Sequence, residues 1–432
     1  MDKLDRFRRL VGQRQDPGPG VDTPALASPS SSSLPDYLDT PHGKVRVLDK
    51  RLETAIPYAP TLMSRVLLPE VTAGAAWLKD ERLRGFGRDG ALFLDVETTG
   101  LSHGAGTVAF LLGLAWFEGE ELVLRQVLLE DYDQEQAQLH LLLERLAQSR
   151  FLVTYNGKSF DRSVLESRLV IHRFMDLDQA HMKLMPHLDL LHLGRRLYSG
   201  MLDSHTLSRM EAEVLGFLRT DDIAGALVPQ MYFQYLLTRD ESVLEPVLRH
   251  NFDDVLSLVH LADALLRLVR PEPPSDNPDL AANLGKLFCQ AGFHAEAVPN
   301  LHVAVAQGTE VQAVRSARLL GAALRRGGRL EPESWRSGQD GRKAHSSADS
   351  AATIGQAALQ AWLTVAQRFP DSVDALVELA KILGRRGGDP AGALALIDRA
   401  LALRPGDPDL LRRRERVAKV GGKKREEDKQ DA

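Results

Sequence analysis

One stretch of the sequence, residues 91–101, limits the folds open to this chain more than any other. It reads Ala-Leu-Phe-Leu-Asp-Val-Glu-Thr-Thr-Gly-Leu. An apolar run that is rich in large side chains and closed by Gly100 predicts a buried strand over residues 91–96. Because side chains alternate across a strand, Asp95 and Glu97 project from the same face, ~7 Å apart along the backbone.

Two carboxylates at the end of a buried strand admit two interpretations. If they lie inside, their charges repel each other and are costly to desolvate unless a cation lies between them. Hard oxygen ligands at this spacing suit Mg²⁺ or Mn²⁺ rather than zinc. Alternatively, the strand runs out into solvent and both acids lie on its exposed end. The rest of the chain decides between these alternatives.

Length and composition fit an ordinary soluble protein of two or three domains. The chain has 432 residues, is 44% hydrophobic and 26% charged, and carries a net charge of −5. Its one cysteine, Cys289, excludes a disulfide framework and a cysteine-based metal site. No apolar stretch follows the N-terminal methionine, and the longest apolar run, residues 107–117, is too short to span a bilayer. We therefore expect a cytoplasmic protein without a signal peptide or membrane segment.

The apolar pattern predicts an α/β domain over residues 43–270. The preceding residues 1–42 are rich in Pro, Ser and Gly and are expected to be disordered. Further strands are predicted at 44–48, 108–117, 121–128, 151–156 and 187–191, and helices at 136–148, at 163–172 and then up to about 268. We expect a mixed sheet with flanking helices, in which strand 91–96 begins an antiparallel meander.

The C-terminal part predicts a second, all-α domain. Residues 271–279 are rich in Pro and indicate a stiff linker. Residues 280–418 resemble three degenerate tetratricopeptide repeats, the second interrupted by a polar insertion at 331–350, with a capping helix from Pro408. The spacing is carried by Leu284, Gly285, Gly292, Ala297 and Leu301, then by Leu320, Gly321, Trp362 and Pro370, and then by Leu379, Ala380, Ala393, Ile397 and Pro405. Residues 419–432 are predicted to form a loose charged tail.

Another candidate acid, Asp161, follows the strand predicted at 151–156 and opens a helix. If that strand lies beside strand 91–96, Asp161 joins Asp95 and Glu97 at one edge of the sheet, as a multi-carboxylate metal site requires. The alternative is that Asp161 is simply the N-cap of its helix, a position that favours aspartate by itself.

The last candidates lie on the helix that contains residues 249–258. Asp254 falls on the apolar stripe of that helix, whereas Asp253 shares a wetter stripe with Ser257 and His260. A carboxylate on an apolar stripe needs a partner, and a metal ion supplies one. His250 lies one turn before Asp254 on the same face and is the natural candidate to accept a proton from an attacking water. A packed or solvated histidine is the alternative.

Together these motifs resemble the three exonuclease motifs of the DEDD superfamily. They are Asp95-x-Glu97-Thr98-Thr99-Gly100-Leu101, Asn156-x-x-x-Phe160-Asp161 and His250-x-x-x-Asp254. That superfamily has the RNase H-like fold and includes proofreading 3′–5′ exonucleases. Residues 155–161 and the region 215–229 are most similar to the bacterial YprB-like group, and the resemblance covers roughly residues 85–268.

The resemblance implies specific roles for these residues. Asp95, Glu97, Asp161 and Asp254 are implied to be ligands of two Mg²⁺ or Mn²⁺ ions, one activating the attacking water and the other stabilising the departing 3′-oxygen. The substrate-binding residues are implied to be Thr98 and Leu101, which meet the terminal nucleotide, together with Asn156, Phe160 and Lys158. The histidine of this superfamily usually precedes the final aspartate by five residues and its tyrosine variant by four. His250 has the tyrosine's spacing, so its role as the base stays open.

Two functions follow as hypotheses. The first is a metal-dependent phosphodiesterase, a 3′–5′ exonuclease on single-stranded DNA or RNA ends, with repeats that bind a protein partner. The second is a weakly active or inactive nucleic-acid-binding scaffold in which the repeats are the working part. The presence of all four acids favours the nuclease. The sequence does not distinguish DNA from RNA or exonuclease from endonuclease action.

Overall fold

The computed structural model describes most of the chain. The described residues are 36–53, 57–58, 61–62, 80–83, 85, 87–100, 106–174, 185–219, 222–269, 274–326, 348–384 and 389–430.

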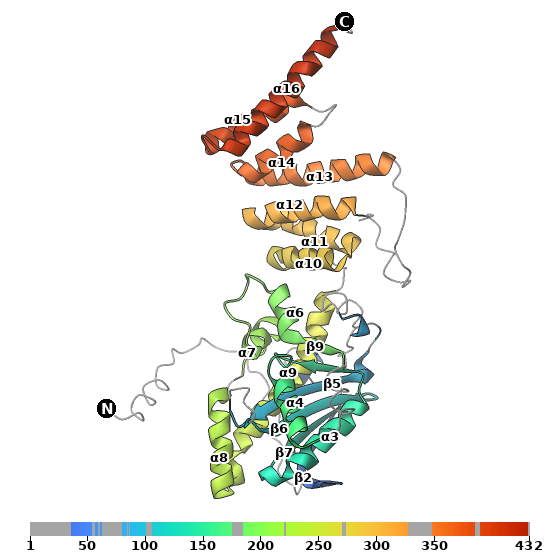
Figure 1. Cartoon of the computed structure of the whole chain (residues 1–432), viewed down its shortest axis with the longest axis vertical. Helices are drawn as coiled ribbons and strands as arrows, with labels where there is room; N and C mark the ends of the chain where they lie inside the picture. Colours follow the sequence, from blue (N-terminus) through green and yellow to red (C-terminus); the bar gives the residue numbers. More distant parts are fainter. Residues whose placement is uncertain are drawn as a thin grey trace, which may run out of the picture. The chain divides into compact units, whose positions relative to one another are not determined.

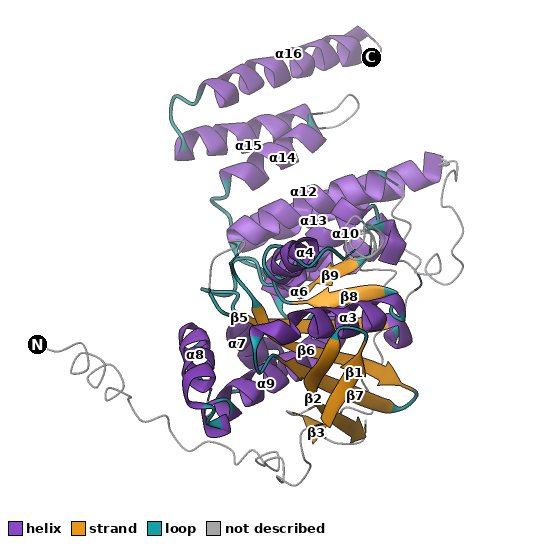
Figure 2. Cartoon of the chain, turned by 60° about the horizontal axis from the view of Figure 1, so that its bottom comes forward, coloured by secondary structure: helices purple, strands orange, loops and turns teal. Residues whose placement is uncertain are grey.

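A seven-stranded mixed sheet is the main feature of the part of the chain before helix α10 (Pro278–Ala291) (Figures 1 and 2). Its strands are β1 (Asp36–Thr40), β2 (Gly43–Glu53), β5 (Ala91–Thr98), β6 (Ala109–Glu118), β7 (Glu121–Leu128), β8 (Phe151–Thr154) and β9 (His187–Asp189). Their order is β1-β2-β7-β6-β5-β8-β9. The antiparallel meander β5-β6-β7 is confirmed, and β8 pairs with β5 in parallel, with β9 parallel to β8. A separate hairpin is formed by β3 (Pro57–Tyr58) and β4 (Thr61–Leu62).

Helices cover both faces of this sheet, because β5 presents apolar side chains to each of them. Leu92 and Leu94 share one core cluster with α3 (Glu135–Ala147) and α4 (Asp161–Ile171). Phe93 belongs to the other cluster, with α6 (Leu190–Leu197) and α9 (Glu245–Leu268). The alternation along β5 therefore places Asp95 and Glu97 on the face that α9 covers.

A glycine allows α9 to approach the sheet at the level of the acids. Gly113 in β6 pairs in register with Asp95. A Cβ atom at Gly113 would lie 2.4 Å from Oδ1 of Asn251 and 2.6 Å from Cγ2 of Val255, both on α9. A larger residue at this point would push the helix away from the strand that carries the acids.

Smaller elements connect α6 to α9. They are α7 (Leu207–Met210), the π-helical turn η5 (Glu211–Leu215), the short 3₁₀ turn η6 (Gly225–Leu227), α8 (Val228–Thr238) and the 3₁₀ turn η7 (Glu241–Val243). The preceding part of the chain contains the 3₁₀ turns η2 (Glu81–Leu83), η3 (Arg88–Gly90) and η4 (Tyr132–Gln134).

The C-terminal part is all-α, as predicted. It contains α10 (Pro278–Ala291), α11 (His294–Gln307), α12 (Glu310–Arg325), α13 (Ala348–Arg368), α14 (Val373–Leu383), α15 (Pro390–Leu403) and α16 (Pro408–Gln430). Each helix packs on the next one along the chain. Close approach within the first pair depends on Gly285, where a Cβ atom would lie 2.6 Å from Cδ2 of Leu301. The tetratricopeptide assignment itself stays a prediction.

Some predicted boundaries were wrong. Strand β1 lies inside the segment 1–42 that we expected to be disordered, and it is held at the sheet edge by the Tyr37 hydroxyl, which donates to Oε2 of Glu130 over 2.8 Å. Helix α16 continues to Gln430 through the stretch predicted to be a loose tail. Charged residues with long unbranched side chains favour helix, which explains this extension.

Within the described residues, the helices are too short or too polar to cross a membrane.

Candidate functional site

The acids of β5 face α9 and receive a neutral hydrogen-bond donor from it. Nδ2 of Asn251 donates to Oδ2 of Asp95 over 2.9 Å. Asn251 is fully buried, and its Oδ1 accepts from Nε2 of Gln126 on β7 over 2.9 Å. This amide chain fixes the Asp95 side chain without neutralising its charge.

Four carboxylates predicted from the sequence act on one another electrostatically. Burial raises the pKa of Asp95 well above its ordinary value, and the charges of Asp254 and Asp161 raise it further. Burial, then Asp95, Asp254 and Asp161, likewise raise the pKa of Glu97. Burial, with contributions from Asp189 and Asp254, raises the pKa of Asp161 to about 7. The printed contacts agree for three of these acids, because His250 lies within 4 Å of both Glu97 and Asp254, at 3.9 and 3.7 Å, and Asn251 on the same helix contacts Asp95.

A tight turn between β8 and α4 delivers Asp161. Asp189 is fully buried and accepts hydrogen bonds from the backbone N–H groups of Asn156 (2.9 Å), Lys158 (3.1 Å) and Leu191 (3.1 Å). A Cβ atom at Gly157 would lie 2.7 Å from Oδ2 of Asp161, so only glycine fits there.

The N-cap alternative for Asp161 is wrong. Phe160 occupies the N-cap position, without a side-chain cap hydrogen bond, and Asp161 is the first residue of α4. Asp161 is 6% exposed, and the charges of Asp189 and Asp254 act on its carboxyl. Capping therefore does not explain why an aspartate stands at this position.

Asp254 reaches the acidic group from α9, although part of our reasoning about that helix was wrong. The stripe of Asp253 was predicted to be the wetter one, yet Ser257 and His260 on it are 0% and 2% exposed. Helix α9 packs not only on the sheet but also against α6 and the π-helical turn η5. Hydrophobic periodicity could not separate the two faces of a helix that is buried on both.

His250 lies among the carboxylates. Its Nδ1 is 2.5 Å from Oδ1 of Asp222, and its Nε2 is 3.9 Å from Oε1 of Glu97 and 3.7 Å from Oδ2 of Asp254. Burial alone would lower the pKa of His250, but the charges of Asp254 and Asp222 outweigh it and raise the pKa. The side chains of Glu97, His250 and Asp254 retain 13–15% exposure, so the group is open to solvent on one side.

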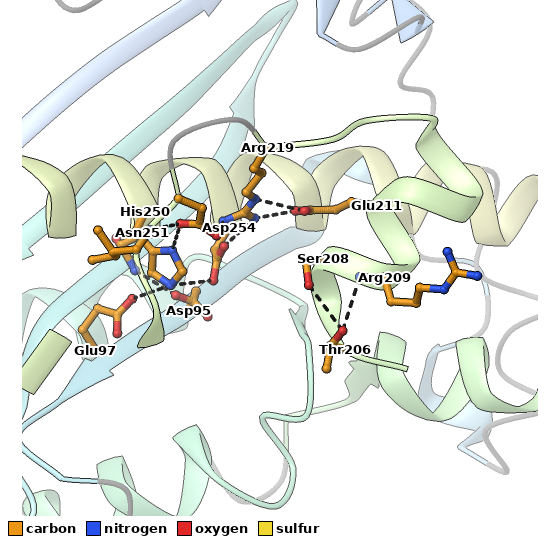
Figure 3. A network of polar contacts seen from close by, with 12 residues as sticks. Asp95, Glu97, Thr206, Ser208, Arg209, Glu211, Arg219, His250, Asn251 and Asp254 are labelled. Atoms are coloured by element: carbon orange, nitrogen blue, oxygen red, sulfur yellow. Dashed lines mark hydrogen bonds and ion pairs between the residues drawn. The ribbon is translucent and has the colours of Figure 1, made fainter. Parts of the chain in front are cut away.

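One arginine, Arg219, contacts the acids around His250. Nη2 of Arg219 lies 2.5 Å from Oδ1 of Asp254, and Nε donates to Oε2 of Glu211 over 2.9 Å. Nη2 also contacts Oε1 of Glu211, and Nη1 lies 3.3 Å from Oδ2 of Asp222. Figure 3 shows the guanidinium between Asp254 and Glu211, with His250 on the other side of Asp254.

The residues predicted to bind substrate have mixed surroundings. The Thr98 hydroxyl is buried and donates to the backbone O of Gly100 over 2.7 Å, which gives it a role in the turn. Asn156 is exposed and has a left-handed backbone with φ 65°. Phe160 packs partly against the core, and burial lowers the pKa of the half-buried Lys158. Leu101 lies outside the described residues. Their contact with substrate stays a prediction.

The donor set fits divalent cations, but the ligands are not in position for one. Among the described side chains, no three His, Cys, Asp or Glu are arranged as a ready-made metal site. Two of the predicted ligands are engaged elsewhere, Asp95 with Asn251 and Asp254 with Arg219. The chemistry of the set is nevertheless that of a Mg²⁺ or Mn²⁺ site: hard carboxylate oxygens whose burial, followed by repulsion from neighbouring acids, raises the pKa of Asp95, Glu97 and Asp161.

Several residues of this group were missed by the sequence reasoning. Asn251 lies on the same stripe as Asp254, which was a usable signal for a buried polar partner. Arg219, Asp222, Glu211 and Gln126 carry no local pattern, because their contacts are made only in the folded chain.

All four acids lie in the part of the chain that matches a known superfamily. Residues 92–266 match the model of the RNase_H superfamily. Over 180 residues the chain is 37% identical to a Bacillus subtilis (strain 168) protein, YprB, which is described as uncharacterized. That match covers 41% of this chain and 42% of YprB, so the chain spans less than half the length of this relative. The α/β part of the chain is therefore an RNase H-like domain.

Proposed function

We propose that this protein is a divalent-metal-dependent nuclease that hydrolyses phosphodiester bonds at single-stranded DNA or RNA ends. One observation carries the proposal. Helix α9 carries Asp254 and His250 up to Glu97 of β5, with Nε2 of His250 3.9 Å from Oε1 of Glu97 and 3.7 Å from Oδ2 of Asp254, while Asn251 of the same helix donates to Asp95. Clustered acids of this kind oppose folding unless they serve a cation.

In this proposal the four carboxylates hold two Mg²⁺ or Mn²⁺ ions. The ions supply positive charge to the scissile phosphate and the leaving 3′-oxygen, and they activate the attacking water. Asp254 has to give up its contact with Arg219 to act as a ligand.

His250 is the proposed general base. Its Nδ1 is held by Asp222, so Nε2 is directed at the space between Glu97 and Asp254, where it can accept a proton. The carboxylate of Asp222 orients the ring and stabilises its protonated form, as an aspartate does in other His–Asp pairs.

The substrate side of the proposal rests on the resemblance to 3′–5′ exonucleases. Thr98 and Leu101 would flank the terminal nucleotide, with Asn156, Phe160 and Lys158 along the neighbouring turn. Arg168 is not available for a phosphate, because it is buried and its Nε donates to Oε1 of Glu135 over 2.5 Å. The helices of the C-terminal part are proposed to bind a protein partner.

A second candidate function is a nucleic-acid-binding scaffold with little or no hydrolytic activity. It is favoured by the ion pair of Asp254 with Arg219, which leaves the carboxylates unprepared for a metal. The two functions differ in whether a phosphodiester bond is cut.

The test is degradation of 3′-labelled and 5′-labelled single strands, as matched DNA and RNA, by the full chain with Mn²⁺. We expect loss of the 3′ label first. Asp254→Asn should lower the rate by at least about 10²-fold, the scale of one lost electrostatic contact to the transition state. Asp253→Asn is the matched control on the same helix and should retain activity. Equal activity of wild type and Asp254→Asn would refute the nuclease.

Metal binding gives a second readout of the same proposal. Mn²⁺ or Mg²⁺ should raise the melting temperature of wild type, because an ion that binds the folded chain stabilises it. Asp95→Asn should show a much smaller rise. Equal shifts in both proteins would contradict the assignment of Asp95 as a ligand.

A further inference from the structure

We infer that Arg219 is a built-in counter-ion that neutralises Asp254 while the site is free of metal and is displaced from it when a divalent ion binds. The inference rests on the proposed function, because it takes Asp254 to be a metal ligand. Arg219, which the fold holds in place, would compete with the metal ion for the carboxylate of Asp254.

The arginine is anchored by Glu211, a buried carboxylate that is not one of the predicted metal ligands. Its side chain is 8% exposed, and the side chain of Glu211 beneath it is 1% exposed. Two nitrogens of the guanidinium, Nε and Nη2, contact the two carboxylate oxygens of Glu211, which is the bidentate geometry that holds arginine most firmly. Glu211 opens the π-helical turn η5, an irregularity that is frequent at functional sites.

The same guanidinium also reaches the ligand. Nη2 lies 2.5 Å from Oδ1 of Asp254, so one of the two oxygens of that carboxylate is already occupied by a cation. A divalent ion at Asp254 needs those lone pairs and repels the arginine charge. The arginine and an ion at Oδ1 of Asp254 therefore exclude each other, and an ion held by the other oxygen, Oδ2, is still opposed by the arginine charge.

Displacement leaves the arginine with two other acidic partners. Glu211 keeps its bidentate contact, and Oδ2 of Asp222 lies 3.3 Å from Nη1 of Arg219. Asp222 also accepts from Nδ1 of His250 through its other oxygen. The exchange at Asp254 is thus linked through one carboxylate to the histidine, and Figure 3 shows Arg219 and His250 on the two sides of Asp254.

The experiment measures Mn²⁺ affinity of the full chain directly, by isothermal titration and by the electron paramagnetic resonance signal of free Mn²⁺. Arg219→Gln removes the competing charge and should bind Mn²⁺ on the order of tenfold more tightly than wild type, as expected for one lost like-charge contact in a partly buried site. Arg219→Lys keeps the charge and should stay close to wild type.

Arg209→Gln is the matched control. Arg209 stands on neighbouring α7, points away from the acidic group and pairs with Asp203 and Glu213 (Figure 3). Its replacement should leave Mn²⁺ affinity unchanged, which separates a local contact from a general change in charge.

Loss of the arginine leaves Glu211 buried and unpaired, so Arg219→Gln risks destabilising the fold. The double variant Arg219→Gln/Glu211→Gln restores a neutral hydrogen-bonded pair while Asp254 stays without its cation. It should show the same gain in Mn²⁺ affinity. In both variants the rise in melting temperature caused by saturating Mn²⁺ should exceed that of wild type.

Unchanged or weaker Mn²⁺ affinity in both glutamine variants would overturn the inference, because it would make Arg219 neutral or a support for the metal ligand. That result leaves the nuclease intact, provided that wild type binds Mn²⁺. If wild type binds no Mn²⁺, the metal-dependent function and this inference fall together.

Discussion

At the scale of single residues, His250 shows how far a motif determines a role. Its spacing from Asp254 is that of a tyrosine in the resembling superfamily, which left its role open. In the folded chain its Nε2 lies within 4 Å of both Glu97 and Asp254, at 3.9 and 3.7 Å, and Asp222 holds the opposite nitrogen. That environment suits a base, because neighbouring carboxylates raise the pKa of the ring.

Replacement of this histidine should separate chemistry from metal binding. His250→Ala is expected to lower kcat by roughly 10²–10⁴-fold, the usual contribution of a general base. The rise in melting temperature on adding Mn²⁺ should persist, because the four carboxylates remain. Single-turnover hydrolysis and thermal melts of the same preparations measure the two effects. A variant that retains wild-type kcat would exclude His250 as the base.

The four acids were predictable and their partners were not. Asp95, Glu97, Asp161 and Asp254 lie in local patterns: a strand end, a helix start and an apolar stripe. Asn251 shares the stripe of Asp254, but nothing in the sequence pairs it with Asp95, and Arg219 reaches Asp254 with no spacing that indicates the contact. The sequence therefore indicated the acidic side chains but not the hydrogen bond and the ion pair that two of them make in the absence of metal.

At the scale of elements, the approach of α9 to β6 determines whether the acids meet. Gly113 is the point of closest approach, and both Asn251 and Val255 of α9 would collide with a side chain there. The helix carries Asp254, so its distance from β5 sets the distance between two predicted ligands.

A methyl group at this contact should weaken both the fold and the site. Gly113→Ala is expected to lower the free energy of unfolding by about 1–3 kcal/mol, the usual cost of overpacking, and to reduce Mn²⁺ affinity because α9 shifts. Gly87→Ala is a suitable control, since a Cβ atom there meets nothing within 4 Å. Urea unfolding and Mn²⁺ titration provide the measurements. Equal free energies of unfolding for the two variants would show that α9 can move away from Gly113 without loss of stability.

The limits of the central strands were predicted well, whereas the burial of the two sides of α9 and the presence of β1 were not. The strands β5, β6 and β7 were found within a few residues, because each is an apolar run closed by a polar turn. The two sides of α9 were misjudged because both are buried. Strand β1 was missed because its sequence is short and polar, and only pairing at the sheet edge orders it.

At the scale of the whole molecule, buried ionisable groups make stability depend on pH. Burial raises the pKa of Asp161 to about 7 and that of Asp253 to about 6. A carboxyl with a raised folded-state pKa stabilises the fold at low pH and loses this contribution as pH rises through that pKa. Burial lowers the pKa of His187 to about 3 and of His260 to about 4, so these histidines oppose folding only below their ordinary value of 6.5.

Above pH 6.5, then, the carboxyls govern the trend. The metal-free protein should lose stability between pH 6.5 and 8, by about 1 kcal/mol from Asp161 alone. Bound Mn²⁺ should cancel this loss of stability, because its positive charge offsets the repulsion between the ionised carboxylates. Asp161→Asn should flatten the dependence without metal. Melting temperatures after chelation, taken across this range, test the sign. A rise with pH, or no difference between wild type and Asp161→Asn, would contradict it.

The buried carboxylate of Asp189 has a consequence for the position of Asp161. It accepts hydrogen bonds from three main-chain amides and so shapes the turn that presents Asp161, yet it stands in β9, outside the three sequence motifs that contain the four acids. A variant that lost Asp189 would still carry Asp95, Glu97, Asp161 and Asp254, but the turn before Asp161 would lose three hydrogen bonds. The position of one acid thus depends on a buried carboxylate that is not itself among the four.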